Sequence, residues 1–175
     1  MRSIEPIAKF DLAFSLFCLQ HKFTHPLSRM SKAVSHTGDG HLYAGIGLLA
    51  YLTAGDEGKL FLLVGLLAFA IELPIYWLAK NLFKRRRPEE LSDLVTSFIT
   101  PSDRYSLPSG HTAAAFLMAT VTGFYFAELQ LFAFVWAALI ASSRILLGVH
   151  FLTDVLLGAL LGILSAQAAL GIVGS

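Results

Sequence analysis

Apolar residues form long blocks from residue 41 onward. Five blocks have helical length, at about residues 41–55, 59–83, 109–127, 129–147 and 150–173. A bilayer core takes about 20 helical residues, so these blocks predict membrane-spanning helices, of which the first and fourth are short. The expected fold class is therefore all-α: a polytopic membrane helical bundle of five to six helices.

The first forty residues have a different pattern, in which charged positions interrupt the apolar ones. These charged residues are Arg2, Glu5, Lys9, Asp11, Lys22, Arg29 and Lys32. The mixture predicts amphipathic N-terminal helices at the membrane interface, divided at Pro26. Residues 4–19 are the one candidate here for a sixth span. Their apolar run ends in "QHKFTHP", which lacks the small-residue cleavage site of a secretory signal.

The polar connections alternate between two sides of the predicted bundle. The turns "GDEGK" and "AEL" join the first span to the second and the third to the fourth, so both lie on one side. The opposite side receives the N-terminal segment, the long polar loop 84–108 and the "LGVH" junction before the last span. The unusual polar residues gather on this second side, which we expect to carry the function.

Composition narrows the class of protein. Of the 175 residues, 55% are hydrophobic and 14% are charged, and the mean hydropathy is +0.66, which indicates an integral membrane protein. A net charge of +1 argues against a general affinity for nucleic acid. Cys18 is the single cysteine, so the chain has neither an internal disulfide nor a Cys-x-x-Cys motif.

Two polar clusters border the long loop. In "KNLFKRRRP", Lys80 to Pro88, basic residues follow the second span; alone, such a run is typical of a topology signal or of anionic-lipid contact. In "LPSGHTAAAF", Ser109 can cap the next helix, whose first N–H groups would then form an anion site. A simple helix cap followed by a solvated histidine is the alternative for this cluster.

The third cluster is "SRILLGVHFLTD", Ser143 to Asp154. A spacing of four places His150 and Asp154 on one helix face, within hydrogen-bond reach, which leaves the other imidazole nitrogen free as a nucleophile or base. The alternative is an ion pair of Arg144 with Asp154 beside an interfacial histidine. Each charge costs roughly 2.5–3.5 kcal/mol at a membrane centre, so both are expected in a polar cavity or at the interface.

Together the clusters suit the transfer of a phosphoryl group, whose three oxygens need several fixed cations and N–H donors, with an acid for the leaving oxygen. The residues that supply these functions are Lys80, Arg87 and Arg144 as cations, Ser109 and Gly110 as donors, and His111 and His150 as proton or phosphoryl carriers. No carboxylate cluster suited to magnesium lies on this side, which predicts chemistry without a metal or other cofactor.

The order Lys-x6-Arg-Pro (80–88), Pro-Ser-Gly-His (108–111) and Ser-Arg-x5-His-x3-Asp (143–154) resembles the three motifs of the type 2 phosphatidic acid phosphatase family. The resemblance implies that His150 attacks phosphorus to form a phosphohistidine, with Asp154 orienting it, and that His111 protonates the leaving alcohol. The phosphate-binding residues that it implies are Lys80, Arg87, Ser109, Gly110 and Arg144. Glycine at position 110 would let phosphate approach the backbone closely.

The implied activity is metal-independent hydrolysis of a lipid phosphate monoester or an isoprenoid phosphate or diphosphate. One membrane-integral phosphatase domain would cover residues 1–175, with an amphipathic segment at 1–40 and a transmembrane catalytic core at 41–173. The expected partners are the lipid substrate and the bilayer; a homodimer is an alternative that no residue pattern supports. Two alternatives stay open: a protein that only binds or transports anionic lipids, and a haloperoxidase-like use of the pocket with vanadate.

The segment "SHTGDGH", before the first span, lies on the catalytic side. His36, Asp39 and His41 are therefore candidates for the mouth of the site, against the alternative of a plain glycine-rich turn.

The charge distribution and the family resemblance disagree about which side of the membrane carries the site. Of the 13 Lys and Arg residues, Lys59 alone lies on the turn side, so the positive-inside rule predicts a cytoplasmic site. The resemblance implies an extracytoplasmic site in a bacterial cytoplasmic membrane. We expect the latter, because active-site cations and phosphate-attracting neighbours such as Lys84, Arg85 and Arg86 are placed by chemistry as well as by topology.

Overall fold

The regular structure is helical throughout the described part of the chain, which in this computed structural model is residues 5–20, 24–101 and 103–174. The helices are α1 (Glu5–Leu19), α2 (Thr24–His36), α3 (His41–Thr53), α4 (Gly55–Phe83), α5 (Gly110–Tyr125), α6 (Gln130–Leu146) and α7 (Leu152–Gly174), with short 3-10 turns at Pro88–Glu90 and Ala127–Leu129. The prediction of an all-α membrane bundle is confirmed. Residues 1–4 and 21–23 of the expected N-terminal segment lie outside the described residues.

The five predicted spans correspond to α3 through α7. Among the described residues, three segments are long and apolar enough to cross a membrane: Gly55–Glu90, Ala127–Leu146 and Leu152–Gly174. The first span is short, as expected, because α3 has 13 residues. The expectation of a short fourth span is wrong, since the 3-10 turn extends that segment to 20 residues. Instead α5 is the second short helix, with 16 residues.

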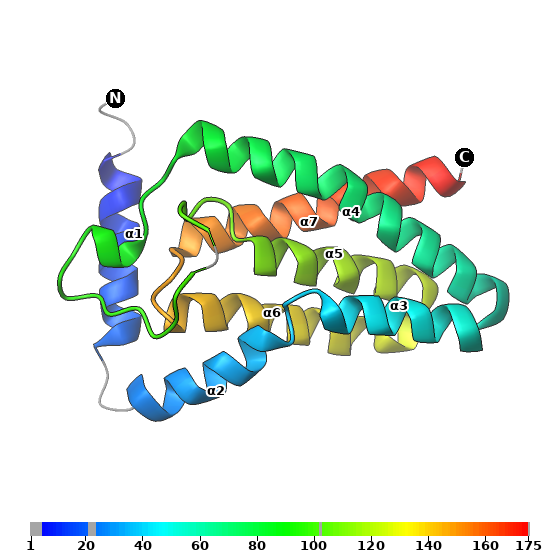
Figure 1. The fold of residues 1–175 in the computed structure, drawn as a ribbon, viewed down its shortest axis with the longest axis horizontal. Helices are drawn as coiled ribbons and strands as arrows, with labels where there is room; N and C mark the ends of the chain where they lie inside the picture. Colours follow the sequence, from blue (N-terminus) through cyan, green and yellow to red (C-terminus); the bar gives the residue numbers. More distant parts are fainter. Residues whose placement is uncertain (1–4, 21–23, 102, 175) are drawn as a thin grey trace.

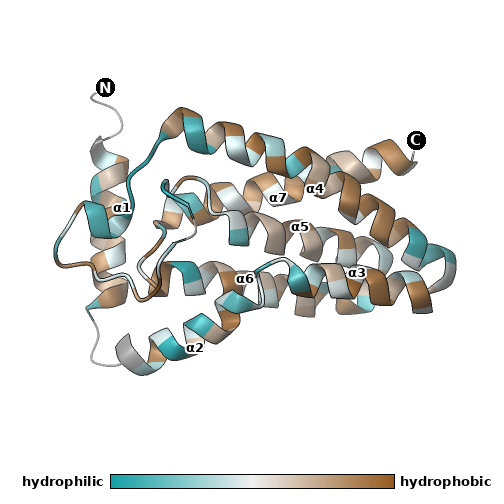
Figure 2. Ribbon diagram, in the orientation of Figure 1, coloured by the Kyte–Doolittle hydropathy of each residue, from teal (hydrophilic) through white to brown (hydrophobic). Residues whose placement is uncertain are grey.

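The helices α3 to α7 run side by side along the long axis of the molecule, and α1 lies across one end (Figure 1). Helix α5 is central, because it packs on α4, α6 and α7. Figure 2 shows hydrophilic residues in the α4–α5 loop and at the α3–α4 turn, with hydrophobic stretches between these two ends. The polar chemistry is thus confined to the ends of an apolar bundle.

The close crossing of α5 and α7 depends on two glycines of α7. A Cβ atom added at Gly162 would lie 2.1 Å from the carbonyl oxygen of Ala113, and one at Gly158 would lie 2.6 Å from that of Ser109. No side chain fits at such separations, so glycine lets the two backbones touch. The crossing brings the start of α5 against the start of α7, and the Ser109 N–H donates to the Asp154 carbonyl at 3.0 Å.

Helix α1 buries two polar residues and exposes several apolar ones. Asp11 and Ser15 are buried against the end of the bundle, whereas Ile7, Phe10 and Phe17 are exposed. A helix that shows its apolar side chains to the surroundings at one end of a membrane bundle suits the interfacial position expected from the sequence. That residues 4–19 lie in the interface stays a prediction. Residue 4 lies outside the described residues.

Candidate active site

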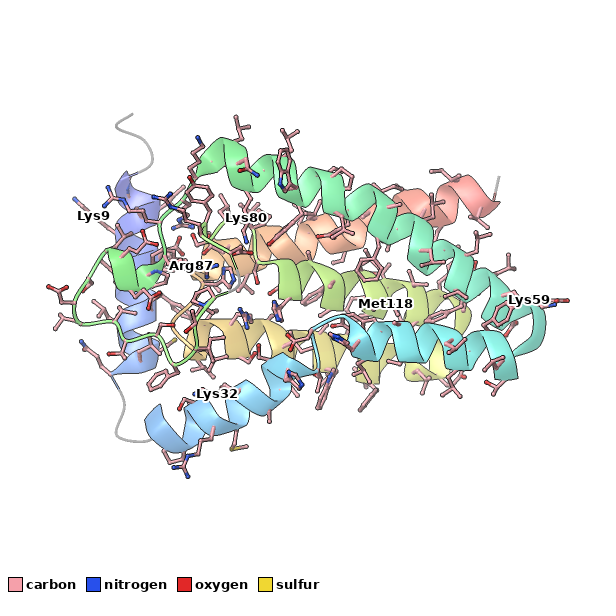
Figure 3. The ribbon with its side chains drawn as sticks, viewed as in Figure 1. Lys9, Lys32, Lys59, Lys80, Arg87 and Met118 are labelled. Carbon is pink, nitrogen blue, oxygen red and sulfur yellow. The ribbon has the colours of Figure 1, made fainter. Side chains whose placement is uncertain are left out.

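The three motifs gather at one end of the bundle. Figure 3 shows Lys80 and Arg87 near α1, at the end opposite Lys59. A cavity of about 550 Å³ lies there, between the Gly38–His41 turn, α4, the α4–α5 loop, the start of α5 and the end of α6. The predicted site residues in its wall are Asp39, His41, Arg87, Gly110, His111, Arg144 and His150. Lys80, Ser109 and Asp154 do not line the cavity. They reach it only through neighbouring residues.

His150 lies in the segment that joins α6 to α7, because α7 begins only at Leu152. The expectation that His150 starts the last helix is therefore wrong. Burial lowers the pKa of His150 to about 4, the charges of Arg144 and Arg87 add to this effect, and Asp154 opposes it. The imidazole is thus neutral near pH 7, which is the form that a nucleophile requires.

Asp154 is close to His150 but is held by other groups. The His150 Nδ1 and Asp154 Oδ2 atoms are 3.6 Å apart, which is too long for the hydrogen bond expected from the sequence. Instead Oδ2 accepts the Phe151 N–H at 2.8 Å, and Oδ1 accepts a bond from Arg85 at 2.7 Å. His150 Nδ1 has no hydrogen-bond partner within the described part of the chain.

Arg85 is a structural residue that sequence reasoning missed. Its two terminal nitrogens reach Asp154 at 2.7 Å and the buried carboxylate of Asp11 at 2.6 Å. Thr153 also donates to Asp11 through its hydroxyl and, at 3.2 Å, through its N–H. The expectation that Arg85 attracts phosphate is wrong, because two buried carboxylates hold its guanidinium and join α1 to the start of α7.

Asp103 is the second residue that the motifs did not reveal. Its Oδ2 accepts bonds from Lys80 at 2.5 Å and from the Tyr76 hydroxyl at 2.6 Å, and its Oδ1 pairs with Arg87. Burial raises the pKa of Asp103, but the bonds from Lys80 and Tyr76 outweigh it and keep the pKa below its usual range. Two buried cations need an anionic partner, so the pair Lys80 and Arg87 is the feature of the sequence that could have indicated a carboxylate such as Asp103.

The two buried arginines keep unused donors. Arg144 donates to the Ser35 hydroxyl at 2.5 Å, and Arg87 donates to the carbonyl of Val149 at 2.6 Å. The Nε atoms of both arginines are buried and have no partner among the residues that the structure describes. Buried, unsatisfied cationic donors beside a cavity are what an anion-binding site requires before its ligand arrives.

The start of α5 differs in detail from the predicted helix cap. Ser109 is at the N-cap position, but its side chain caps no N–H group and instead accepts a bond from the Thr112 hydroxyl at 2.9 Å. Gly110 faces the Tyr76 ring, since a Cβ atom there would lie 3.0 Å from the ring. Glycine at this position therefore accommodates Tyr76 as well as leaving room beside the cavity.

The Gly38–His41 turn supplies Asp39 and His41 to the cavity wall. The Asp39 Oδ1 atom lies 2.7 Å from Nε2 of His111, and the carbonyl of Asp39 lies 3.1 Å from Nδ1 of His41. Burial raises the pKa of Asp39, but hydrogen bonds and charge from His111 and His36 outweigh it, so the net pKa is lowered. The turn is thus in contact with the candidate proton donor.

Two further cavities adjoin the site. A polar one of about 560 Å³ lies between α2 and the α4–α5 loop and shares His111 and Arg144 with it. An apolar groove of about 390 Å³ between α3 and α4 shares Gly40, Phe69 and Leu73 with it. The candidate site therefore borders a polar space on one side and an apolar space on the other.

Within the described residues, no group of three or more His, Cys, Asp or Glu side chains is arranged to hold a metal ion. Metal-free chemistry stays a prediction.

Comparisons with known proteins agree with this arrangement. The PAP2 superfamily profile matches residues 59–174. The chain is 34% identical over 137 residues to the decaprenylphosphoryl-5-phosphoribose phosphatase of Mycobacterium tuberculosis, covering 75% of this chain and 72% of that one. It is 30% identical over 138 residues to the Arabidopsis thaliana protein named "Probable lipid phosphate phosphatase beta", covering 63% of this chain and 64% of the relative.

The fold also matches a solved structure. The crystal structure of Aquifex aeolicus LpxE superimposes with a TM-score of 0.80 at 27% sequence identity, covering 93% of this chain and 95% of that one. The profile match covers all three motifs, and the structural match covers the bundle that places them at one end. The chain is an integral membrane protein that belongs to the PAP2 superfamily of phosphatases.

Proposed function

We propose that the chain hydrolyses a lipid phosphate monoester or an isoprenoid phosphate or diphosphate, without a metal, through a phosphohistidine on His150. The observation that carries the proposal is the convergence of Arg87, His111, Arg144 and His150 on one cavity. Both arginines have buried Nε donors without partners among the described residues, and His150 is neutral. A site that only bound anionic lipids would need the cations but neither histidine, so the binding alternative is not favoured.

The reaction has two steps. In the first, the free imidazole nitrogen of His150 attacks the terminal phosphorus, the bond from that phosphorus to the leaving oxygen breaks, and His111 gives its proton to that oxygen. The leaving group is the lipid alcohol of a monoester or the isoprenoid monophosphate of a diphosphate. In the second, a water molecule attacks the phosphohistidine, His111 takes a proton from the water, and the phosphorus–nitrogen bond breaks to release inorganic phosphate. Each group returns to its starting state, so the cycle needs no further reactant.

The cations supply the electrostatic part of the proposal. Arg87 and Arg144 are in the cavity wall, and Lys80 reaches the site through its contacts with Tyr76 and Asp103. The Asp103 carboxylate bridges Lys80 and Arg87. A phosphate suits the place between two cations that this carboxylate occupies. A phosphate dianion forms stronger charge-assisted bonds there than a carboxylate does. We propose that substrate phosphate displaces Asp103 from at least one of these cations.

The apolar groove supports a lipid as the substrate. Gly40, Phe69 and Leu73 belong to both the groove and the site cavity, so a chain attached to a phosphate can lie along α3 and α4. Tyr43, Phe61 and Met118 complete an almost wholly apolar lining. The names of the relatives include both a lipid phosphate phosphatase and a phosphatase of a decaprenyl lipid, and either chain type suits such a groove.

We also propose that the site faces the extracytoplasmic side of a bacterial cytoplasmic membrane. The count of basic residues, which favours a cytoplasmic site, includes residues that the fold itself requires. Lys80, Arg85 and Arg87 pair with carboxylates, and Arg144 bonds to Ser35. A chain carrying Cys18→Ala and Lys59→Cys tests the orientation in intact cells, because its one thiol lies at the start of α4, at the end of the bundle opposite the site. Protection of that thiol from a membrane-impermeant maleimide agrees with the proposal, and labelling without cell rupture contradicts it.

Phosphate release by the purified protein tests the activity. The substrates are phosphatidate, phosphatidylglycerophosphate, farnesyl diphosphate and undecaprenyl diphosphate, each with EDTA in detergent, and His150→Ala is the control. Release that survives EDTA and disappears in the variant is the expected result. A folded protein that binds these lipids without releasing phosphate would favour the binding alternative. Halide oxidation by the vanadate-loaded protein would favour the haloperoxidase alternative.

A further inference from the structure

The Asp39 carboxylate lies between two imidazoles. Its Oδ1 atom is 2.7 Å from Nε2 of His111, and its Oδ2 atom is 2.5 Å from Nδ1 of His36. The side chain of His36 is 85% exposed, that of Asp39 35% and that of His111 24%, so the three residues lead from the surface to the cavity. None of the three family motifs includes Asp39 or His36.

The turn that carries Asp39 is built against His111. A Cβ atom at Gly38 would lie 3.2 Å from Cδ2 of His111, so glycine lets the backbone approach the ring. The Trp136 N–H on α6 donates to the Thr37 hydroxyl at 3.0 Å, and that hydroxyl donates to the Val34 carbonyl at 2.6 Å. The turn is therefore anchored to both α2 and α6, and its position relative to His111 is fixed.

Charged groups of both signs surround the His111 ring. Arg144 lies in the same cavity wall and its charge opposes a positive charge on the ring, whereas the carboxylates of Asp39 and Asp103 in that wall favour it. The other titratable groups in the same cavity wall are His41, Glu72, Tyr76, Arg87 and His150. Of the acidic groups in this wall, Asp39 is the one in direct contact with the ring. A neutral ring carries one proton, so only the charged ring can serve both Asp39 and a leaving oxygen.

We propose that Asp39 is a positioning residue for the general acid His111, holding its ring in place and stabilising the charged form that donates a proton. This inference rests on the proposed function and adds a residue to it. In the first step this role matters only where the leaving oxygen needs a proton. The alkoxide of a lipid alcohol needs one in the transition state, whereas a nitrophenolate leaves without protonation.

The test compares Asp39→Asn with the intact chain on two substrates, phosphatidate and p-nitrophenyl phosphate. Asparagine keeps the size of the side chain and removes its charge. We expect the first step with phosphatidate, measured in a single turnover, to slow by at least about tenfold, within the range that general acids contribute, and the initial burst of p-nitrophenolate from p-nitrophenyl phosphate to change by less than about threefold. The charged ring then loses its proton more easily, so the alkaline limb of kcat/KM for phosphatidate moves down by about one pH unit.

Two controls separate this role from a structural one. Asp56→Asn removes a carboxylate that is paired with Lys59 at the start of α4, and we expect it to leave both activities unchanged. In a His111→Ala background, Asp39→Asn is expected to cause no further loss with phosphatidate, because the two residues act as one unit.

An equal loss on both substrates, or no loss on either, would overturn the role of Asp39 while leaving the proposed function intact. An intact chain that hydrolyses neither these two substrates nor the isoprenoid diphosphates of the activity assay would remove the proposed function, and the role of Asp39 with it.

Discussion

Nδ1 of His150 lies 3.6 Å from Oδ2 of Asp154, and both oxygens of that carboxylate are already engaged. Oδ2 accepts the Phe151 N–H and Oδ1 accepts the Arg85 guanidinium. Asp154 therefore fixes the backbone next to His150 as well as placing a negative charge beside its ring. In the proposed reaction that charge stabilises the imidazole as it becomes positive on attacking phosphorus.

Replacing Asp154 with asparagine removes this charge and keeps an acceptor for the Phe151 N–H. We expect kcat to fall on the order of 10²–10⁴-fold, as when an orienting carboxylate is lost, with a smaller change in KM. Steady-state kinetics in detergent, with p-nitrophenyl phosphate as well as a lipid, measure the loss. Activity within about threefold of the intact chain would show that the charge has no part in the reaction.

Arg85 is expected to contribute to stability rather than to catalysis. Replacing it with glutamine leaves the buried carboxylates of Asp11 and Asp154 without their cation, which costs about 3–5 kcal/mol for a buried pair. Thermal unfolding in detergent should show a clear drop in Tm. The matched control is Arg86→Gln at an exposed neighbouring position, where the effect stays within about 0.5 kcal/mol. Equal Tm values for the two variants would contradict the structural role of Arg85.

Asp103 should compete with phosphate for Lys80 and Arg87. Asp103→Asn removes the competing charge, so inorganic phosphate is expected to inhibit the variant about tenfold more strongly, equivalent to about 1.4 kcal/mol. Product inhibition during p-nitrophenyl phosphate hydrolysis measures this change. Asp93→Asn, at an exposed position of the same loop, is the control with unchanged inhibition. Weaker inhibition of Asp103→Asn would mean that Asp103 organises the cations for phosphate instead of competing with it.

The apolar groove should determine how tightly long chains bind. A Cβ atom at Gly65 meets nothing within 4 Å, so leucine at this position fills the groove without displacing the protein. Displacing about two methylene groups costs about 1.6 kcal/mol, so we expect KM for a long-chain lipid phosphate to rise about tenfold. Gly45→Leu on α3 is the control, since its Cβ also meets nothing and Gly45 does not line the groove. An equal rise in KM for p-nitrophenyl phosphate would contradict a chain-binding groove.

The bundle and the gathering of the motifs could be predicted because both depend on local patterns. Long apolar runs require helices in a membrane, and an even number of spans between the 80–88 motif and the start of the last span returns the chain to the same side. The sequence therefore placed Arg87, His111, Arg144 and His150 at one end before any contact was known. Their convergence on one cavity follows from this topology and from the α5–α7 crossing at Gly158 and Gly162.

The partners of the motif residues could not be predicted in this way. Arg85 pairs with Asp11, which is 74 positions away, and Lys80 pairs with Asp103, which is 23 positions away. No periodicity links such positions, because the ion pairs depend on how α1 and the α4–α5 loop pack on the bundle. The start of α7 at Leu152 was missed for a related reason, since Gly148 turns the chain with φ +73 and keeps His150 outside the helix.

A labelling experiment tests the central claim most directly. The His111→Ala variant is mixed with p-nitrophenyl phosphate carrying ³²P and quenched in base, in which phosphohistidine is stable, and the labelled residue is identified by mass spectrometry. Without His111 to activate water, the second step is slow, so label is predicted to accumulate on His150 and to be absent when His150→Ala is added. A protein that releases phosphate at the normal rate with His150→Ala alone, or that carries its label on another residue, would contradict the account.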